Sequence, residues 1–338
     1  MGTSIGEQQK LAKMAAGGWP VYYDAELARW QARDGRRPIS ASEISAQLST
    51  KWLGHNLICV EEVDSTNQMA KLCIVQQESL GAQGSRGAPK APRAQGDRGI
   101  RGTVIVAEKQ TAGRGRLLRQ WVSHPRVGLW FSAILGPFPP ARAALLSFLT
   151  AVSVCRVIRD VAGLMAELKW PNDIMISDRK VCGILLEAGS DGESVIAGVG
   201  LNVNQRRDEF PTVLQETATS LVLEAGHPFD RPFLLAAILG NIEARVETLI
   251  DDGSASLMDE YRSLCTTIGK RVRIDFPDRA EEYGVVSGIA DSGAVIFVPD
   301  AAGAAGAAGA GAAGGIRGGA MHAREVMAGD ITHLRTQN

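Results

Sequence analysis

The stretch that decides the fold lies in the middle of the chain, where residues 169–204 read KWPNDIMISDRKVCGILLEAGSDGESVIAGVGLNVN. Three runs rich in apolar residues follow one another here: Ile174–Ser177, Lys180–Ala188 and Ser194–Asn202. The turn Asp178-Arg179 separates the first two runs and residues 189–192 separate the last two, so the pattern predicts three consecutive strands joined by hairpins. Glycines inside such strands are typical of places where another group approaches the backbone closely.

The segments on either side alternate between strands and helices. The sequence predicts further strands at Leu57–Val63, Thr103–Ala107 and Val127–Leu135, and helices at about Gln68–Gln77, Ala141–Val161, Pro232–Ile250 and Ser254–Ser263. Ser40 and Glu43 form a capping box that begins another helix, which we expect to run to about Leu53. Together these elements predict one α/β (α+β) domain over residues 39–264.

The chain from residue 265 to residue 338 predicts a small β-barrel. Short strands are expected at Arg271–Phe276, Ala280–Ile289, Ala294–Val298, Met321–Met327 and Asp330–Leu334. Two segments of biased composition, residues 81–101 in the first domain and the Gly/Ala-rich residues 301–319 in the barrel, predict flexible insertions. Residues 1–38 are a polar extension in which we expect at most a short helix, at Ala25–Ala32.

The composition argues against several classes of protein. Lys plus Arg number 36 and Asp plus Glu 37, and this formal net charge of -1 is not the basic excess of a dedicated nucleic-acid binder. The five cysteines are an odd, scattered set without a CxxC pair, which is typical of reduced thiols. The longest apolar stretch is too short to span a bilayer, and no signal peptide is visible. We therefore expect a cytoplasmic protein without a membrane partner.

The loop Gly113-Arg114-Gly115-Arg116, with Arg119 three residues later, is the first candidate for chemistry. Glycine lets a backbone approach a ligand closely, and arginine offers planar donors that grip phosphate or carboxylate at two points. The loop is neither a Walker A motif nor a GxGxxG motif. Its composition fits an anion-binding loop, and a solvated Gly/Arg loop is the alternative.

Lysine and asparagine side chains mark several predicted strands. Lys169 precedes the turn Pro171-Asn172-Asp173, where proline fixes the chain and the lysine can project from the end of a strand. Taken alone, a surface lysine at a strand corner explains Lys169 better than a functional role. Lys180, Asn202 and Asn204 are less easily explained as packing.

Five segments in this order resemble the motifs of the biotin protein ligases. The family shows DSTN, QTAGRGRxGRxW, KWPND, KxxGILxE and GxGxNxN, and this chain carries them at Asp64–Asn67, Gln110–Trp121, Lys169–Asp173, Lys180–Glu187 and Gly198–Asn204. The resemblance is strong over about residues 44–204 and weak in the C-terminal domain. One departure is Leu118, which stands where the family has a second loop glycine and which bears on how the loop closes.

The resemblance implies a class II aminoacyl-tRNA-synthetase-like mixed sheet with helices, followed by an SH3-like barrel. It implies an enzyme that activates biotin with ATP to biotinyl-5'-AMP and then transfers biotin to one lysine of a biotin carboxyl carrier protein, with Mg²⁺ on the pyrophosphate oxygens. Two anions must meet in the first step, so fixed cations are the groups that this chemistry needs. Lys169 and Arg116 are therefore the expected catalytic residues.

The family motifs divide the other site residues between the two substrates. The resemblance places biotin against one set: Ser65, Thr66, Asn67, Gln110, Arg114, Gly115, Arg116 and Lys169. It places ATP or the adenylate against a second set: Arg114, Arg116, Arg119, Trp121, Asn172, Lys180, Asn202, Asn204 and Arg335. For Trp121, stacking on adenine and anchoring the core are both open, and for Arg335 a solvated chain end is the slightly favoured alternative. Asp173 could orient Lys169, hold the metal or simply make the turn.

Two other functions stay open. A lipoate or octanoate ligase would share this architecture, but KWPND and the loop that ends in Trp121 match the biotin enzymes better. A transcriptional repressor that senses biotinyl-AMP would need a winged helix, and residues 1–38 are poorly patterned for one. We therefore predict a ligase without DNA-binding activity. A sheet edge could pair two copies as a homodimer, but the sequence does not fix the oligomeric state.

Overall fold

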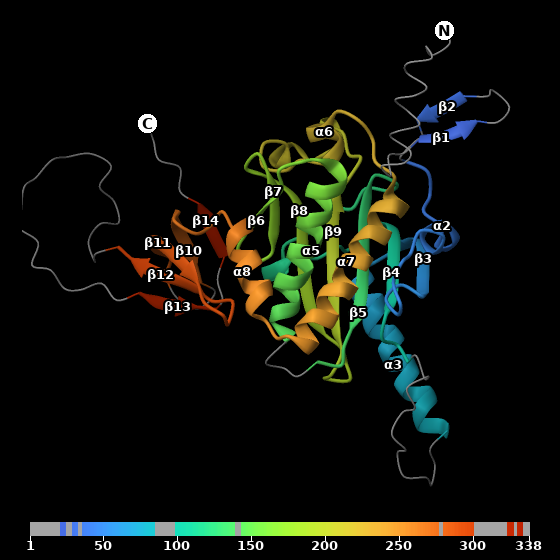
Figure 1. Ribbon diagram of the computed structural model, residues 1–338, viewed down its shortest axis with the longest axis horizontal. Coiled ribbons are helices and arrows are strands. Elements are labelled where there is room, and N and C mark those ends of the chain that lie inside the picture. The colour runs from blue at the N-terminus through green and yellow to red at the C-terminus, as the bar shows by residue number, and fades with distance from the viewer. Residues whose placement is uncertain are drawn as a thin grey trace, which may run out of the picture.

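The computed structural model describes residues 21–24, 29–32, 36–84, 99–138, 143–276, 280–300, 323–327 and 330–333. A seven-stranded mixed sheet forms its centre, in the order β3-β4-β5-β9-β8-β7-β6 (Figure 1). Its strands are β3 (Asn56–Val63), β4 (Thr103–Gln110), β5 (Gly128–Leu135), β6 (Glu167–Lys169), β7 (Asp173–Ile176), β8 (Arg179–Ala188) and β9 (Val195–Asn202). Only β3 and β4 pair in parallel. The three consecutive strands predicted from residues 174–202 are confirmed.

Helices cover both faces of this sheet. On one face lie α5 (Leu145–Ala162) and α7 (Arg231–Asp251), with α8 (Ala255–Leu264) packed beside α5. On the other face α3 (Thr66–Gly84) packs on β4, β5 and β9. The strands alternate accordingly: Phe131 and Ala133 of β5 face the main core, whereas Ile134 joins a smaller cluster beneath α3.

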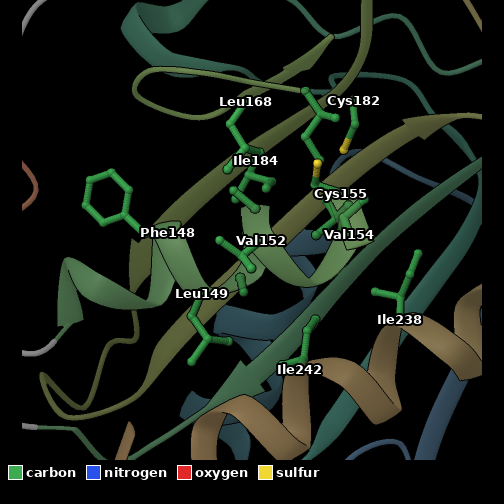
Figure 2. Close-up of a cluster of buried hydrophobic side chains, with 14 of the residues drawn as sticks. Phe148, Leu149, Val152, Val154, Cys155, Leu168, Cys182, Ile184, Ile238 and Ile242 are labelled. Atoms are coloured by element: carbon green, nitrogen blue, oxygen red, sulfur yellow. The ribbon is translucent and has the colours of Figure 1, made fainter. Parts of the chain in front are cut away.

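The main core lies between the sheet and α5 and α7. Figure 2 shows its centre, to which α5 contributes Phe148, Leu149, Val152, Val154 and Cys155. Cys182 of β8 lies in the same cluster, and both cysteines are free and buried. Burial raises the pKa of the Cys155 thiol to about 12. These thiols therefore act as apolar fillers, as the scattered cysteine pattern indicates.

The C-terminal part of the chain forms a second, five-stranded antiparallel sheet in the order β13-β12-β11-β10-β14. Its strands are β10 (Arg271–Asp275), β11 (Glu282–Ile289), β12 (Val295–Pro299), β13 (Arg324–Val326) and β14 (Asp330–His333). This sheet packs against the first domain, since a Cβ on Gly293 would overlap the ring of Phe148 in α5. The fold class, a mixed α/β domain followed by a small all-β domain, is confirmed. Residues 301–319, the predicted insertion between the paired strands β12 and β13, lie outside the described residues.

Two expectations about the N-terminal part are wrong. Residues 29–32 are not helical but form β2 (Arg29–Ala32), which pairs with β1 (Val21–Asp24) and places Trp30 opposite Tyr23. The helix capped by Ser40 and Glu43 is present as α2 (Ala41–Ser45), but it ends well before Leu53. The chain turns instead because the buried carboxylate of Glu243 in α7 accepts the backbone N–H groups of residues 51–53.

Helix α3 is longer than predicted and runs through Gly84, so residues 81–84 of the expected insertion are helical. Residues 85–98 lie outside the described part of the chain. The remaining short elements are η1 (Arg116–Leu118), η2 (Arg207–Glu209), η3 (Thr212–Leu214) and α6 (Leu221–Ala225). Within the described ranges, none of the helices combines the length and the apolar character that crossing a membrane requires.

A buried ion pair fastens the segment before α2 to the sheet. Arg231, at the start of α7, is 1% exposed and places Nη1 2.8 Å from Oε2 of Glu108 in β4. The same guanidinium donates to the backbone carbonyls of Gly128 and Arg37, and Glu108 also accepts the N–H of Ile39. Both charges are fully hydrogen-bonded, which is the condition under which a buried pair is tolerated.

Candidate active site

Residues from several of the motifs lie side by side in one row across the sheet. The strand registers pair Trp130 with Gly200, Gly200 with Gly183, Gly183 with Asp173, and Asp173 with Lys169. Directly opposite residues of antiparallel strands project to the same face and lie on strands about 4.8 Å apart. We call these five residues the site row. It lies on the α3 face of the sheet, because Trp130 shares the face of Ile134, which packs in the cluster beneath α3.

The corner between β3 and α3 brings together the residues expected to hold one substrate. Ser65, Thr66 and Asn67 are all buried at the start of the helix. The backbone N–H and the hydroxyl of Thr66 lie 2.9 and 3.2 Å from Oε1 of Gln110, which ends the parallel neighbour β4. The amide of Gln110 in turn donates to Ser123 Oγ at 3.0 Å. Thr66 and Gln110 are therefore hydrogen-bonded to each other at this corner, and Ser65 and Asn67 flank Thr66 in the chain.

Sequence reasoning missed three residues that complete this corner. Ser132 of β5 is fully buried, and its Oγ lies 2.7 Å from Thr66 Oγ1 and 2.6 Å from Asn67 Oδ1. Nδ2 of Asn67 donates to Glu187 Oε2 at 2.7 Å, and Nζ of Lys71 donates to the other Glu187 oxygen at 2.5 Å. Two signals could have found them: a single hydroxyl in the otherwise apolar strand of residues 128–135, and a lysine one helical turn after Asn67.

The charge of Glu187 is fixed by its neighbours. Burial alone would raise the pKa of this carboxyl, but the hydrogen bonds from Lys71 and Asn67, together with the charges of Lys71 and Arg114, outweigh burial and lower it. Glu187 is therefore ionised at neutral pH. It orients Asn67 by accepting one N–H of its amide.

Glycines on two strands make room for the side chains that lie over the sheet. A Cβ on Gly198 would lie 2.9 Å from Cγ of Asn67 and closer still to its oxygen. A Cβ on Gly200 would lie 2.5 Å from the indole of Trp121, and one on Gly183 would lie 2.9 Å from the same ring. The sequence-based expectation of close approach at these glycines is confirmed.

Trp121 therefore packs flat on the sheet glycines, with Trp130 edge-on at 6.2 Å between ring centroids. This position fits the anchoring role. Its Nε1, however, is buried and has no hydrogen-bond partner among the described residues. Such a donor is costly unless a ligand or water accepts from it.

The Gly/Arg loop is narrow, and its last residue, Trp121, is hydrogen-bonded to its first glycine, Gly113. The N–H of Trp121 donates to Gly113 O at 2.9 Å, the N–H of Gly115 donates to Arg119 O at 2.7 Å, and η1 forms the tip. The left-handed position in the loop is Leu117, with φ 53° and ψ 38°, not the following Leu118. Leu118, which replaces the family glycine, thus keeps an ordinary backbone conformation here. Arg114 and Arg119 are exposed and Arg116 is half-buried.

The lysines of the KWPND and KxxGILxE segments differ in their partners. Nζ of Lys180 lies 2.6 Å from Asp173 Oδ1 and 5.3 Å from the centre of the Trp121 ring. Asp173 therefore pairs with Lys180, a contact that the sequence did not predict. Lys169 is half-buried at the end of β6, at the far end of the site row.

The asparagines predicted for the nucleotide side are held by internal hydrogen bonds. Asn202 donates to Thr219 O and accepts from Gln205, and Asn204 both donates to and accepts from the backbone of Phe229. Asn172 donates to Ile184 O at 2.6 Å. This geometry explains all three as fold-forming groups and adds no support to nucleotide contacts. Arg335 lies outside the described residues.

No group of three His, Cys, Asp or Glu side chains that could hold a metal ion occurs among the residues the structure describes. Mg²⁺ does not require such a group, because it keeps several of its waters and is usually bound through one or two carboxylates together with substrate phosphates.

Comparison with known proteins identifies the class to which this fold and site belong. The model of the biotin/lipoate A/B protein ligase family matches residues 100–204. The bifunctional ligase/repressor BirA of Bacillus subtilis is 35% identical over 81% of this chain and 80% of its own length. The biotin–[acetyl-CoA-carboxylase] ligase of Mycobacterium tuberculosis is 33% identical over 70% of this chain and 80% of its own length.

A solved structure agrees with the sequence relatives. The biotin protein ligase of Aquifex aeolicus in complex with biotin and ATP superposes with a TM-score of 0.62 at 25% identity, covering 83% of this chain and all of that one. The chain belongs to the biotin protein ligases of the biotin/lipoate A/B protein ligase family. The resemblance drawn from the five sequence motifs is confirmed.

Proposed function

We propose that this protein activates biotin with ATP to biotinyl-5'-AMP and then transfers the biotinyl group to a lysine of a biotin carboxyl carrier protein. The observation that carries the proposal is the juxtaposition on one face of the sheet of the polar corner at residues 65–67, Gln110 and Ser132 with the site row that ends in Lys169. The ureido ring of biotin is a neutral cyclic urea that needs short donors and acceptors, which the corner offers. The biotin carboxylate attacks a phosphate, and this step needs cations beyond the corner.

Support for the two substrates comes from the relatives. The Aquifex structure holds biotin and ATP, and the Mycobacterium relative is named as a ligase acting on acetyl-CoA carboxylase. We extend both to this chain as part of the proposal. We also retain Mg²⁺, bound by the phosphate oxygens of ATP and by water, since the described residues build no cage for it.

Within this proposal Lys169 and the arginine loop supply positive charge in the first step. The biotin carboxylate attacks the α-phosphorus of ATP, pyrophosphate leaves, and the lysine ammonium offsets the charge that grows on the phosphoryl oxygens. Arg114 and Arg116 stand on a loop whose base is fixed to Trp121, so its tip can close over the phosphate. In this proposal the buried Nε1–H of Trp121, which has no partner among the described residues, donates to the adenylate.

The second step needs no nucleophile from the enzyme. The carrier lysine attacks the acyl carbon of the mixed anhydride, AMP leaves with the bonding electrons, and the lysine nitrogen loses a proton. The protein's part is to shield the adenylate from water and to orient the two partners.

The test is ATP–pyrophosphate exchange with biotin, lipoate or octanoate added in turn. We expect exchange that requires biotin, and we expect Lys169→Ala to abolish most of it while leaving thermal unfolding unchanged. Lys109→Ala is the matched control, because this exposed lysine pairs only with Glu62 on the surface. Exchange supported by lipoate instead of biotin would reject the proposed substrate, and equal exchange by Lys169→Ala and Lys109→Ala would reject the proposed catalytic lysine.

The absence of DNA-binding activity stays a prediction. The net charge of -1 supports it. Four bacterial relatives, the one from Bacillus subtilis among them, are named as repressors as well as ligases. An electrophoretic shift with the operator of the host's own biotin genes decides the matter, and a salt-sensitive, sequence-specific shift would contradict the prediction.

A further inference from the structure

The strand that carries Lys169 is an edge of the large sheet, and the C-terminal domain holds its outer side. On the inner side β6 pairs with β7, Lys169 lying opposite Asp173. On the outer side the segment leading out of α8 runs alongside β6: the N–H of Thr266 donates to Leu168 O at 2.8 Å. The backbone around Lys169 is therefore fixed from two directions, one of them outside the large sheet.

Thr267 makes the contact closest to the lysine. It is fully buried, and its Oγ1 accepts the backbone N–H of Trp170, the residue after Lys169, at 3.0 Å. The Trp170 ring is anchored in the same region, since its Nε1 donates to Gly293 O at 2.9 Å. These two hydrogen bonds tie one residue of the KWPND corner to the second domain at both its backbone and its side chain.

His333 of β14 completes the hydrogen bonding of Thr267. Its Nε2 lies 3.1 Å from Thr267 Oγ1. Since the threonine oxygen accepts from Trp170, its own hydrogen can be donated to an unprotonated Nε2. Burial, together with the nearby charges of Lys169 and Lys270, lowers the pKa of His333 to about 4, against the opposing charge of Asp178. The ring is therefore neutral at pH 7, as this arrangement requires.

We propose that Thr267 and His333 are positioning residues for Lys169: the chain of hydrogen bonds from His333 through Thr267 to the Trp170 N–H sets where the lysine projects toward the reacting carboxylate and phosphate. This inference rests on the proposed function. The hydrogen bonds of Thr267 run to Trp170 and His333, at the lysine end of the site row.

The test uses substitutions that remove only the hydroxyl chain. Thr267→Val keeps the shape of the side chain but leaves the Trp170 N–H without its acceptor, and Thr267→Ser restores the hydroxyl. The matched control is Thr266→Val, whose hydroxyl donates to Leu168 O at 3.2 Å and not to Trp170. His333→Leu tests the outer end of the chain from a strand at the edge of the small sheet, so the inference can be judged even if Thr267→Val does not fold.

The readout separates positioning from general damage. In biotin-dependent ATP–pyrophosphate exchange we expect Thr267→Val to lower kcat about 10- to 100-fold, the usual effect of displacing a reacting group by about 1 Å, with KM for biotin within about twofold of the parent. His333→Leu should lower kcat in the same direction, and Thr267→Ser should return it to within about threefold.

The outcomes distinguish this inference from the proposed function. If the parent protein shows no exchange with biotin, the proposed function is wrong, and so is the inference that rests on it. Biotin-dependent exchange by the parent, together with an unchanged kcat in His333→Leu and in any folded Thr267→Val protein, refutes the inference alone. An equal loss of kcat in Thr266→Val also refutes the inference. A change that appears in KM for biotin rather than in kcat refutes it as well.

Discussion

Replacing Gly198 by alanine should break the polar corner, and removing Asn67 first should reverse the effect. The added methyl would lie 2.9 Å from Cγ and Nδ2 of Asn67 and closer to Oδ1. Asn67 cannot move away freely, because it is 4% exposed and is held by hydrogen bonds with Ser132, Glu187 and the carbonyl of Leu185. The change must therefore disrupt part of this network.

The size of the effect follows from that network. If all three hydrogen bonds are lost, at about 0.5–1.5 kcal/mol each, the loss is about 1.5–4.5 kcal/mol. Alanine in place of a strand glycine returns about 0.5–1 kcal/mol. We therefore expect Gly198→Ala to destabilise the protein by up to about 4 kcal/mol, and KM for biotin to rise because the corner is displaced.

A double-mutant cycle of Gly198→Ala and Asn67→Ala tests whether the loss of stability comes from the clash with Asn67. In Asn67→Ala protein the obstacle is absent, so Gly198→Ala should stabilise by about 0.5–1 kcal/mol. Urea denaturation of the parent, the two single variants and the double variant, monitored by tryptophan fluorescence, measures all four stabilities. An equal cost of Gly198→Ala with and without Asn67 would show that the glycine serves the backbone alone and would refute the steric argument.

Three further perturbations follow from the described contacts. Arg231→Met should destabilise by about 3–5 kcal/mol, because it leaves the Glu108 carboxylate buried without its partner, whereas Glu108→Gln should cost less; chemical denaturation compares them. The pKa of His333 in the folded protein is lowered from its ordinary 6.5 to about 4. Its contribution to stability is therefore fully present above about pH 6.5 and is lost as the pH falls toward 4. His333→Gln should lose less stability than the parent protein over this pH range, and parallel slopes would contradict the argument. Trp121→Phe keeps the packing on Gly183 and Gly200 but removes the buried N–H, so adenylate should dissociate faster while thermal stability changes little; unchanged retention would limit Trp121 to an anchoring role.

The sequence by itself determined most of the architecture near the motifs. Apolar runs separated by short turn signals gave three consecutive strands within one or two residues of their observed bounds, because each hairpin is specified by local turn chemistry. The capping box of Ser40 and Glu43 was likewise readable and is present. The five motifs also indicated the family, since their order along the chain is more specific than any one of them.

The sequence could not reveal partners that lie far away in the chain. Helix α2 ends at Ser45, and residues 51–53, which the predicted helix would have included, donate their N–H groups to Glu243, about two hundred residues later. For the same reason, the local sequence does not show that Ser132 of β5 is hydrogen-bonded to Asn67. Nor does the local sequence show that Asn202 and Asn204 donate to the backbone carbonyls of Thr219 and Phe229; their contacts with the nucleotide stay a prediction.

What only the tertiary structure decided is which side chains share a face and a row. A strand alternates its side chains strictly, so local sequence can place Gly183, Gly200 and Lys169 on strands, but only the hydrogen-bond register aligns them. The contact of Thr267 and His333 with the lysine corner depends on the docking of a second sheet, which no local propensity encodes. The chemistry of the residues was therefore present in the sequence, and their arrangement came from long-range pairing and packing.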